Sequence, residues 1–434
     1  MPSAREKHEN GASPSSRAKR GICGSLLPLL LALPAAAQKP AHATVVDPAR
    51  LARIDSVLER AVREEQIGGG VLLVLRDGRP VYERAVGWAD KESGRRMTSD
   101  AVFRIASQTK ALTSAAILIL IEEGRFTLGT PVSRFIPTFA RTMVAVKADT
   151  GRTLVPAARA ITIRDLLTHT AGISYGTEPL VAPLYAAQAL GPSAGWGWYT
   201  ADKDEPVCTT MERLGTLPFV AQPGERFVYG YNTDILGCVV EKASGKPLDV
   251  FIRERITGPL GLRDTKFFVD PADRARLATV YMSDSSGKAV RAPDGARGQG
   301  HYVDGPRRSF AGGAGLTSTA RDYARFLEAI RRDGALDGVR ILSPRSATLM
   351  HTNLVGTRYR EDNSRGFGLG FETVERLDSY QSVGSYGWGG AYGSEYTVDP
   401  ANGLVVVWMM QLLPSRATVP GTFAALVTQA FVEK

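Results

Sequence analysis

The chain has 434 residues, of which 44% are hydrophobic and 22% charged, and this composition excludes disordered and collagen-like proteins. Its formal net charge of +9 comes from Lys and Arg residues that are spread along the sequence, without the basic block or module of a nucleic-acid-binding protein. We therefore expect a mildly basic globular protein that does not bind nucleic acid and has one large domain or two.

The first 37 residues have the pattern of a secretory signal peptide. Three basic residues within positions 17–20 precede an apolar stretch at 21–33, and Ala35-Ala36-Ala37 supplies an Ala-x-Ala cleavage site. A retained membrane anchor is the less favoured alternative, because the stretch contains proline and is shorter than the roughly 20 residues that span a bilayer. We expect an exported protein, periplasmic or secreted, whose mature chain has no membrane span. Residues 38–47, polar and rich in Pro and Ala, are expected to form a linker.

Strands are expected near both ends of the chain and helices between them. The expected strands form two hairpins, 71–75 with 81–86 and 385–398 with 404–410. The expected helices are 49–66, 107–123, 163–170, 247–260, 320–332 and 423–431, and the segments 179–210 and 271–308 are expected to be irregular. This order predicts an α/β fold over residues 48–434. Its α/β part is built from about 48–106 and 310–434, and a mostly helical part, about 107–309, is inserted between them.

Three serines are followed three residues later by a lysine: Ser16/Lys19, Ser107/Lys110 and Ser285/Lys288. This spacing puts both side chains on one face of a helix, where a lysine kept neutral by burial can take the serine proton. Ser16 lies in the segment expected to be removed, and Ser285 lies in a solvated turn. Ser107 opens a helix that is nearly all apolar, so its hydroxyl lies near free backbone N–H groups and the stem of Lys110 is buried. The alternative for this pair is a helix-capping serine followed by a surface lysine.

Two Gly-x-Ser-x-Gly sequences, centred on Ser174 and Ser193, are competing nucleophile motifs. That motif works only on a sharp turn from a strand into a helix. Neither sequence has a predicted strand before it and a helix after it. We therefore expect both to be glycine-rich loops.

Cysteine and histidine residues give no sign of a metal or a catalytic thiol. An oxidising compartment permits a disulfide between Cys208 and Cys238, but Cys238 lies in an apolar helical run where a free cysteine is also common, so both states stay open. The histidines are scattered and form no His-Glu-x-x-His motif, so we expect no metal and no cofactor. His169 is expected to have a structural hydrogen-bonding role.

Five segments in order resemble the serine β-lactamase and penicillin-binding-protein superfamily. They are Phe103–Lys110, Leu166–Ile173, Pro223–Tyr229, Gly312–Ala320 and Trp388-Gly389-Gly390. The second is similar to a signature of the class C branch, and the third to the segment that leads to the family's catalytic tyrosine. The resemblance extends from about residue 50 to the C-terminus and implies an antiparallel sheet flanked by helices from both termini.

The resemblance also implies a role for each matched residue. Ser107 would be acylated, and Lys110 and Tyr229 would share the proton transfers. The backbone N–H groups of Ser107 and Ala391 would form the oxyanion hole. Without the flanking match, Tyr229 would be taken for a core tyrosine.

Two departures from the family pattern concern substrate binding. Two positions after the catalytic tyrosine the family usually has Asn, whose amide contacts the substrate, but this chain has Tyr231. We expect Tyr231 to contact the substrate there in a different way. Lactamases and DD-peptidases usually have Lys-Thr-Gly where this chain has Trp388, Gly389 and Gly390. A tryptophan replaces the positive charge for a substrate carboxylate with apolar surface and one N–H donor.

Trp-Gly-Gly at this place resembles the family VIII carboxylesterases, so we expect a serine hydrolase that cleaves small carboxylic esters through an acyl-serine intermediate. One alternative is a β-lactamase or D-alanyl-D-alanine carboxypeptidase acting on β-lactams or peptidoglycan peptides. Another is a non-catalytic penicillin-binding-like protein.

Overall fold

The computed structural model describes residues 44–190, 203–296 and 298–433. The predicted signal peptide, the start of the predicted linker and the Ser193 motif lie outside these residues. None of the helices in the described ranges is long and apolar enough to cross a membrane.

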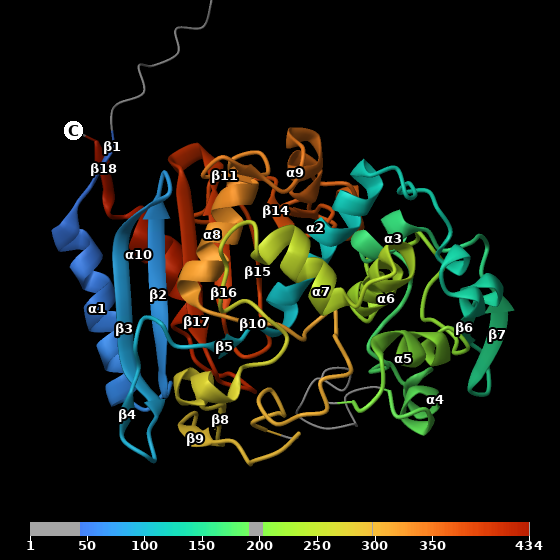
Figure 1. Ribbon diagram of the computed structural model, residues 1–434, viewed down its shortest axis with the longest axis horizontal. Coiled ribbons are helices and arrows are strands. Elements are labelled where there is room, and N and C mark those ends of the chain that lie inside the picture. Colours follow the sequence, from blue (N-terminus) through green and yellow to red (C-terminus); the bar gives the residue numbers. More distant parts are fainter. Residues whose placement is uncertain (1–43, 191–202, 297, 434) are drawn as a thin grey trace, which may run out of the picture. The chain divides into compact units, whose positions relative to one another are not determined.

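An eight-stranded antiparallel sheet forms the centre of the fold, with the strand order β13-β14-β15-β16-β17-β2-β3-β4 (Figure 1). Its strands are β2 Gly69–Arg76, β3 Arg79–Asp90, β4 Arg95–Arg96, β13 Arg365–Phe367, β14 Glu372–Val374, β15 Tyr386–Gly389, β16 Glu395–Asp399 and β17 Leu404–Met410. Strand β17 pairs with β2, which brings the two ends of the domain side by side. The predicted fold class, an antiparallel sheet built from both ends of the chain, is confirmed.

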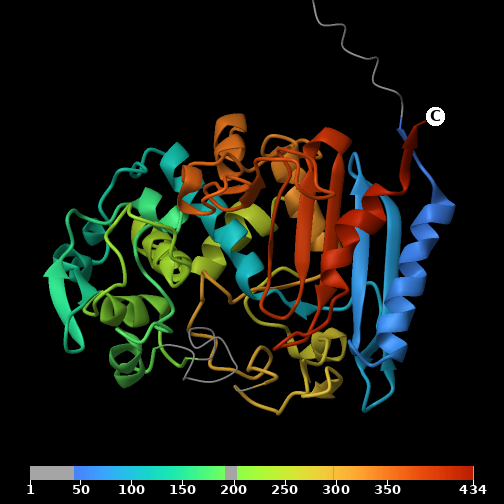
Figure 2. The ribbon, with the colours of Figure 1, turned by 180° about the vertical axis from the view of Figure 1, so that it is seen from behind.

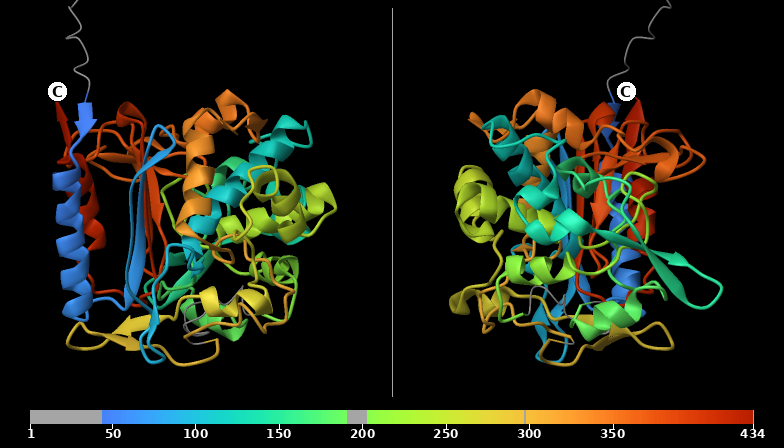
Figure 3. Two further views of the ribbon diagram at one scale, coloured as in Figure 1. Left: turned by 60° about the vertical axis from the view of Figure 1, so that its left-hand side comes forward. Right: turned by 90° about the vertical axis from the view of Figure 1, so that its right-hand side faces the viewer.

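Helices cover both faces of the sheet. Side chains alternate between the two faces of each central strand, so an apolar strand presents apolar surface on both sides for helices to pack against. Leu72 and Val74 of β2 and Trp408 of β17 pack in a cluster with α1 (Pro48–Arg63) and α10 (Phe423–Thr428). Their neighbours on the opposite face belong to the main core, which includes α2 (Thr109–Glu122) and α8 (Ala320–Arg331). The left view of Figure 3 shows the sheet between α1 and α8.

The middle of the sequence forms the helical region at the end of the domain far from α1 (Figures 1 and 2). Its α-helices in the described residues are α3 Ile163–Leu167, α4 Ala182–Ala187, α5 Val207–Leu214, α6 Asn232–Ser244 and α7 Leu248–Ile252. A disulfide bond joins Cys208 of α5 to Cys238 of α6, which settles the alternatives that the sequence leaves open. Thr162 caps α3 through a capping box with Asp165.

Several elements differ from the sequence prediction near the C-terminus. The expected strand 385–398 is two strands, because the chain turns back between β15 and β16, where the N–H of Gly390 donates to the Ser394 carbonyl over 2.7 Å. The expected helix 423–431 ends at Thr428 as α10, and β18 (Phe431–Glu433) follows. Strand β18 pairs with β1 (Thr44–Val46), so the expected linker 38–47 ends in a strand.

Other differences lie in the middle of the chain. The expected helix 247–260 is α7 followed by a π-helical turn, Arg253–Thr257. The irregular segment 271–308 contains the hairpin of β8 (Tyr281–Ser283) and β9 (Ala289–Arg291). A further hairpin, β6 (Met143–Lys147) with β7 (Arg152–Pro156), is missed because its strands are short and partly exposed.

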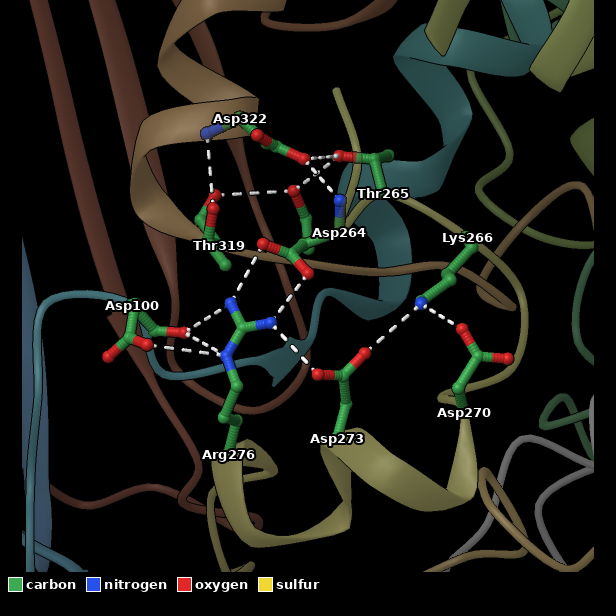
Figure 4. Close-up of polar contacts among 10 residues, drawn as sticks. Asp100, Asp264, Thr265, Lys266, Asp270, Asp273, Arg276, Thr319 and Asp322 are labelled. Carbon is green, nitrogen blue, oxygen red and sulfur yellow. Dashed lines mark hydrogen bonds and ion pairs between the residues drawn. The ribbon is translucent and has the colours of Figure 1, made fainter. Parts of the chain in front are cut away.

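A network of ion pairs around Arg276 fixes the segment before the predicted nucleophile (Figure 4). The Arg276 guanidinium lies 2.8 Å from the Asp264 carboxylate and donates to the backbone oxygen of Asp100, also over 2.8 Å. The hydrogen bonds that Arg276 donates to the Asp264 carboxylate raise the pKa of Arg276 above its usual value. The Asp264 N–H in turn donates to Asp322 in the first turn of α8 over 2.7 Å, and the Arg276 carbonyl accepts from the Val102 N–H. The network therefore ties residues 100–102 to α8, directly before β5 (Phe103–Arg104).

Candidate active site

Ser107 lies on a strained turn between a strand and a helix. Strand β5 pairs with β10 (Thr317–Ser318), and a 3₁₀ turn, Ala106–Gln108, then leads into α2. Ala106 is fully buried and has a φ of +43°, a conformation that costs energy for any residue with a side chain. The turn leaves Ser107 7% exposed, at the wall of a cavity of 760 Å³.

Lys110 lies one helical turn after Ser107 and is 4% exposed. Its Nζ lies 3.1 Å from Ser107 Oγ, 2.7 Å from the Gly313 carbonyl oxygen and 3.1 Å from the Tyr175 hydroxyl. Three oxygen atoms therefore surround the amine of Lys110 at hydrogen-bond distance. Gly313 is itself held by its N–H, which donates to Asp234 Oδ1 over 3.0 Å. The amine is thus fixed within proton-transfer distance of Ser107.

Tyr229 lines the same cavity, and its hydroxyl accepts a hydrogen bond from Trp388 Nε1 over 3.2 Å. Lys110 Nζ lies 4.8 Å from the centroid of the Tyr229 ring, which is a cation–π distance. The structure therefore brings together Ser107, Lys110 and Tyr229, with Trp388 as the partner of the tyrosine hydroxyl.

His169 holds the segment that leads to Tyr229. Its carbonyl accepts from the Val228 N–H over 2.7 Å, and its ring centroid is 4.8 Å from that of Tyr229. Burial lowers the pKa of His169 well below its ordinary value, so the ring is neutral and Nδ1 accepts from Asn232 Nδ2 over 3.0 Å. Asn232 also donates to the Val228 carbonyl. This is the structural hydrogen-bonding role that the sequence predicts for His169.

The end of β15 lies directly against the nucleophile turn. A Cβ atom added to Gly390 would lie 2.7 Å from the Ile105 carbonyl oxygen, so a larger residue would push the two segments apart. Gly389, Gly390 and Ala391 line the cavity together with Ser107. Ser107 and Ala391, whose N–H groups are predicted to form an oxyanion hole, therefore line the same cavity.

Tyr231 does not reach this wall. Its side chain is fully buried at the start of α6, and its ring packs edge-on against that of Tyr175, with the centroids 5.0 Å apart. The tyrosine that hydrogen-bonds to Lys110 Nζ is instead Tyr175, which the sequence does not predict. Its only sequence signal is its position two residues after the matched segment Leu166–Ile173.

The competing serines in the described residues are not placed for catalysis. Ser174 is 1% exposed, and its hydroxyl accepts from the Gly176 N–H over 3.0 Å within a loop. Ser285 is exposed, and Lys288 forms an ion pair with Glu65 over 3.0 Å instead. Across the described ranges, no group of His, Cys, Asp and Glu side chains could hold a metal ion.

Comparison with known proteins identifies the family. The family model described as Beta-lactamase matches residues 54–429. Esterase EstB of Burkholderia gladioli is 34% identical over 86% of this chain and 93% of its own length, and the lovastatin esterase of Penicillium rubens is 30% identical over 87% and 96%. The solved structure of EstCE1, a hydrolase with promiscuous acyltransferase activity, superposes with a TM-score of 0.73 at 28% identity, covering 88% of this chain and 98% of its own.

A family match over this range, together with esterase relatives aligned over nearly their whole length, accounts for the fold. The chain belongs to the β-lactamase family and is a serine hydrolase.

Proposed function

We propose that this protein hydrolyses small carboxylic esters through an acyl intermediate on Ser107. The observation that carries the proposal is the 3.1 Å contact between Lys110 Nζ and Ser107 Oγ at the wall of the cavity. A non-catalytic penicillin-binding-like protein would have no need of this pair, or of Tyr229 beside it.

The reaction has two halves. Ser107 Oγ attacks the ester carbonyl and gives up its proton, while the N–H groups of Ser107 and Ala391 stabilise the oxyanion. Lys110 and Tyr229 share the transfer of that proton to the leaving alkoxide, which departs as an alcohol. A water molecule then attacks the acyl-serine by the reverse of these steps, and the carboxylic acid is released.

Trp388 favours an ester over a β-lactam. It occupies the place of the lysine that attracts a substrate carboxylate in lactamases, and its single donor is used by the Tyr229 hydroxyl. Arg365 is the one arginine among the described residues of the cavity wall, but it donates to Gln381 over 2.7 Å and lies 3.5 Å from Asp378. Its charge is therefore already engaged. The relatives named as esterases support the same substrate class.

Replacing Trp388 with lysine should shift preference toward substrates that carry a carboxylate. For the wild-type protein we expect kcat/KM for p-nitrophenyl butyrate to exceed that for a chromogenic cephalosporin. In Trp388→Lys this ratio should fall by about tenfold, the effect of one added ionic contact of about 1.4 kcal/mol. Faster cephalosporin than ester turnover in the wild type would favour the β-lactamase alternative. An unchanged ratio in the variant would mean that position 388 does not contact the substrate.

We also propose that the protein is exported and that residues 1–37 are its signal peptide. The basic and apolar pattern before Ala37 supports this, as does the Cys208–Cys238 bond, because disulfides persist in oxidising compartments. N-terminal sequencing of protein recovered from the periplasm or medium should begin at Gln38. Recovery of the full chain from the cytoplasm alone would contradict the proposal.

A further inference from the structure

One face of β15 carries no side chains at its centre. Tyr386 and Trp388 point to the main core, and Gly387 and Gly389 alternate with them, so they face the opposite side of the sheet. Helices α1 and α10 cover this side of the sheet, which faces the reader in the rear view of Figure 2. The cavity that begins at Ser107 continues over the two glycines.

The continuation, which we call the rear compartment, has mostly apolar walls, although Thr397 of β16 and Thr428 of α10 also line it. Strand β17 contributes Val406 and Trp408, and α10 contributes Phe423, Ala424 and Val427. A volume of 760 Å³ for the whole cavity is within the usual range for sites that enclose drug-sized ligands, so it exceeds what a butyryl group occupies.

Glu395 is an acidic side chain of the rear compartment. It lies on β16 directly opposite Gly389 on one side and Trp408 on the other. Its carboxyl has no hydrogen-bond or ion-pair partner among the described residues, and burial raises its pKa to about 8. The group is therefore protonated at neutral pH and can donate a hydrogen bond.

The other charged groups of the cavity wall are engaged with neighbours. Arg365 of β13 is held by Gln381 and Asp378 as described above. The Tyr359 hydroxyl donates to Glu372 of β14, and Ser382 Oγ donates to Asp399 of β16 over 2.7 Å. The segments of β17 and α10 that line the cavity bring no ionisable group toward Glu395. The walls of the compartment are thus mostly apolar, and the protonated Glu395 carboxyl offers a hydrogen-bond donor that no neighbour among the described residues uses.

We propose that the rear compartment binds an uncharged apolar chain of about eight to ten carbons, which belongs to the ester whose carbonyl lies at Ser107. The inference rests on the proposed esterase function and narrows its substrate class. A carboxylate or ammonium group at the end of the chain would bind less well than an uncharged end, because the mostly apolar walls solvate a charge poorly. An ether, ester or keto oxygen on the chain would accept the hydrogen bond of Glu395.

Filling the compartment tests the proposal. In Ala424→Trp, the ratio of kcat/KM for p-nitrophenyl decanoate to that for the butyrate should fall at least about tenfold, because the indole takes the volume of several methylene groups. The matched control is Ala186→Trp, an exposed alanine on α4, also a six-residue helix. It should keep the wild-type ratio. An equal fall for both esters, or no fall, in a folded Ala424→Trp protein would overturn the proposal.

A binding measurement separates this proposal from the esterase function. Titration calorimetry with 2-dodecanone, an uncharged and unreactive chain, should show binding to the wild-type protein and weaker binding to Ala424→Trp by at least about tenfold. This result would hold even if no ester were hydrolysed. Absence of binding to the wild type, or equal binding to both proteins, would overturn the proposal whatever the catalytic result.

The isosteric variant Glu395→Gln gives a second test that needs no change of shape. Above pH 8 the wild-type carboxyl ionises, so KM for the decanoate should rise while KM for the butyrate changes less. In Glu395→Gln this extra rise should disappear. A rise of the same size in both proteins, or none in the wild type, would show that Glu395 does not face the chain.

Discussion

Replacing Ser107 with alanine is expected to lower kcat for p-nitrophenyl butyrate by about 10⁴-fold or more, because the acyl intermediate can no longer form. The fold should survive the change, since the hydroxyl contributes one contact, to Lys110 Nζ, within a turn fixed by β5 and α2. Initial rates under saturating substrate, together with a thermal melt of each variant, would check both statements. Lys110→Ala should show a loss of similar order, because the two residues act as a unit.

Two other serines provide matched controls for Ser107. Ser174→Ala removes the serine of the competing Gly-x-Ser-x-Gly sequence, and Ser285→Ala removes that of the exposed Ser-x-x-Lys pair. Both should retain turnover close to that of the wild type. If Ser174→Ala were inactive and Ser107→Ala active, the nucleophile would have to be reassigned.

The two tyrosines beside Lys110 should differ in their effects. Tyr229→Phe is expected to lower kcat by about 10²- to 10⁴-fold, because its hydroxyl is at the cavity wall and takes part in proton transfer. Tyr175→Phe removes a hydrogen bond to Lys110 Nζ, so a fall of about tenfold is expected. A pH profile of kcat/KM distinguishes the two roles, since Tyr175→Phe should shift the profile with little change in KM.

Trp388 provides a check on the tyrosine assignment. Its Nε1 donates to the Tyr229 hydroxyl, so Trp388→Phe should weaken turnover in the wild-type background and have little effect in Tyr229→Phe. If Tyr175→Phe proved as damaging as Tyr229→Phe, the proton would have to pass through Tyr175, and the role taken from the family resemblance would be wrong.

The parts of the site that follow from local spacing could be predicted from the sequence. Ser107 and Lys110 are one helical turn apart, so their contact needs little more than the helix itself. The hairpin of β2 and β3 follows from alternation around an Asp-Gly turn in the same way. Strand β17 is apolar throughout, which predicts that both its faces are covered, as they are.

The parts that depend on tertiary packing could not be predicted. Tyr175 reaches Lys110 only because the loop after α3 folds back over α2 and α6. In the sequence, Glu395 has the pattern of an exposed strand residue. Its burial depends on Gly389 and Trp408, which lie opposite it on the neighbouring strands. The turn from Gly390 to Ser394 breaks the expected single strand 385–398, and Gly390 at this turn lies against Ile105, a residue far away in the sequence.

The pairing of β2 with β17 has a consequence for the order of events during biosynthesis. The middle of the sheet joins residues 69–76 to residues 404–410, so its central ladder cannot close until residues 404–410 have left the ribosome. Pairings between such distant segments form late and slowly. Until those residues emerge, the chain has no completed sheet, and the export that we propose could act on the chain while it is still unfolded.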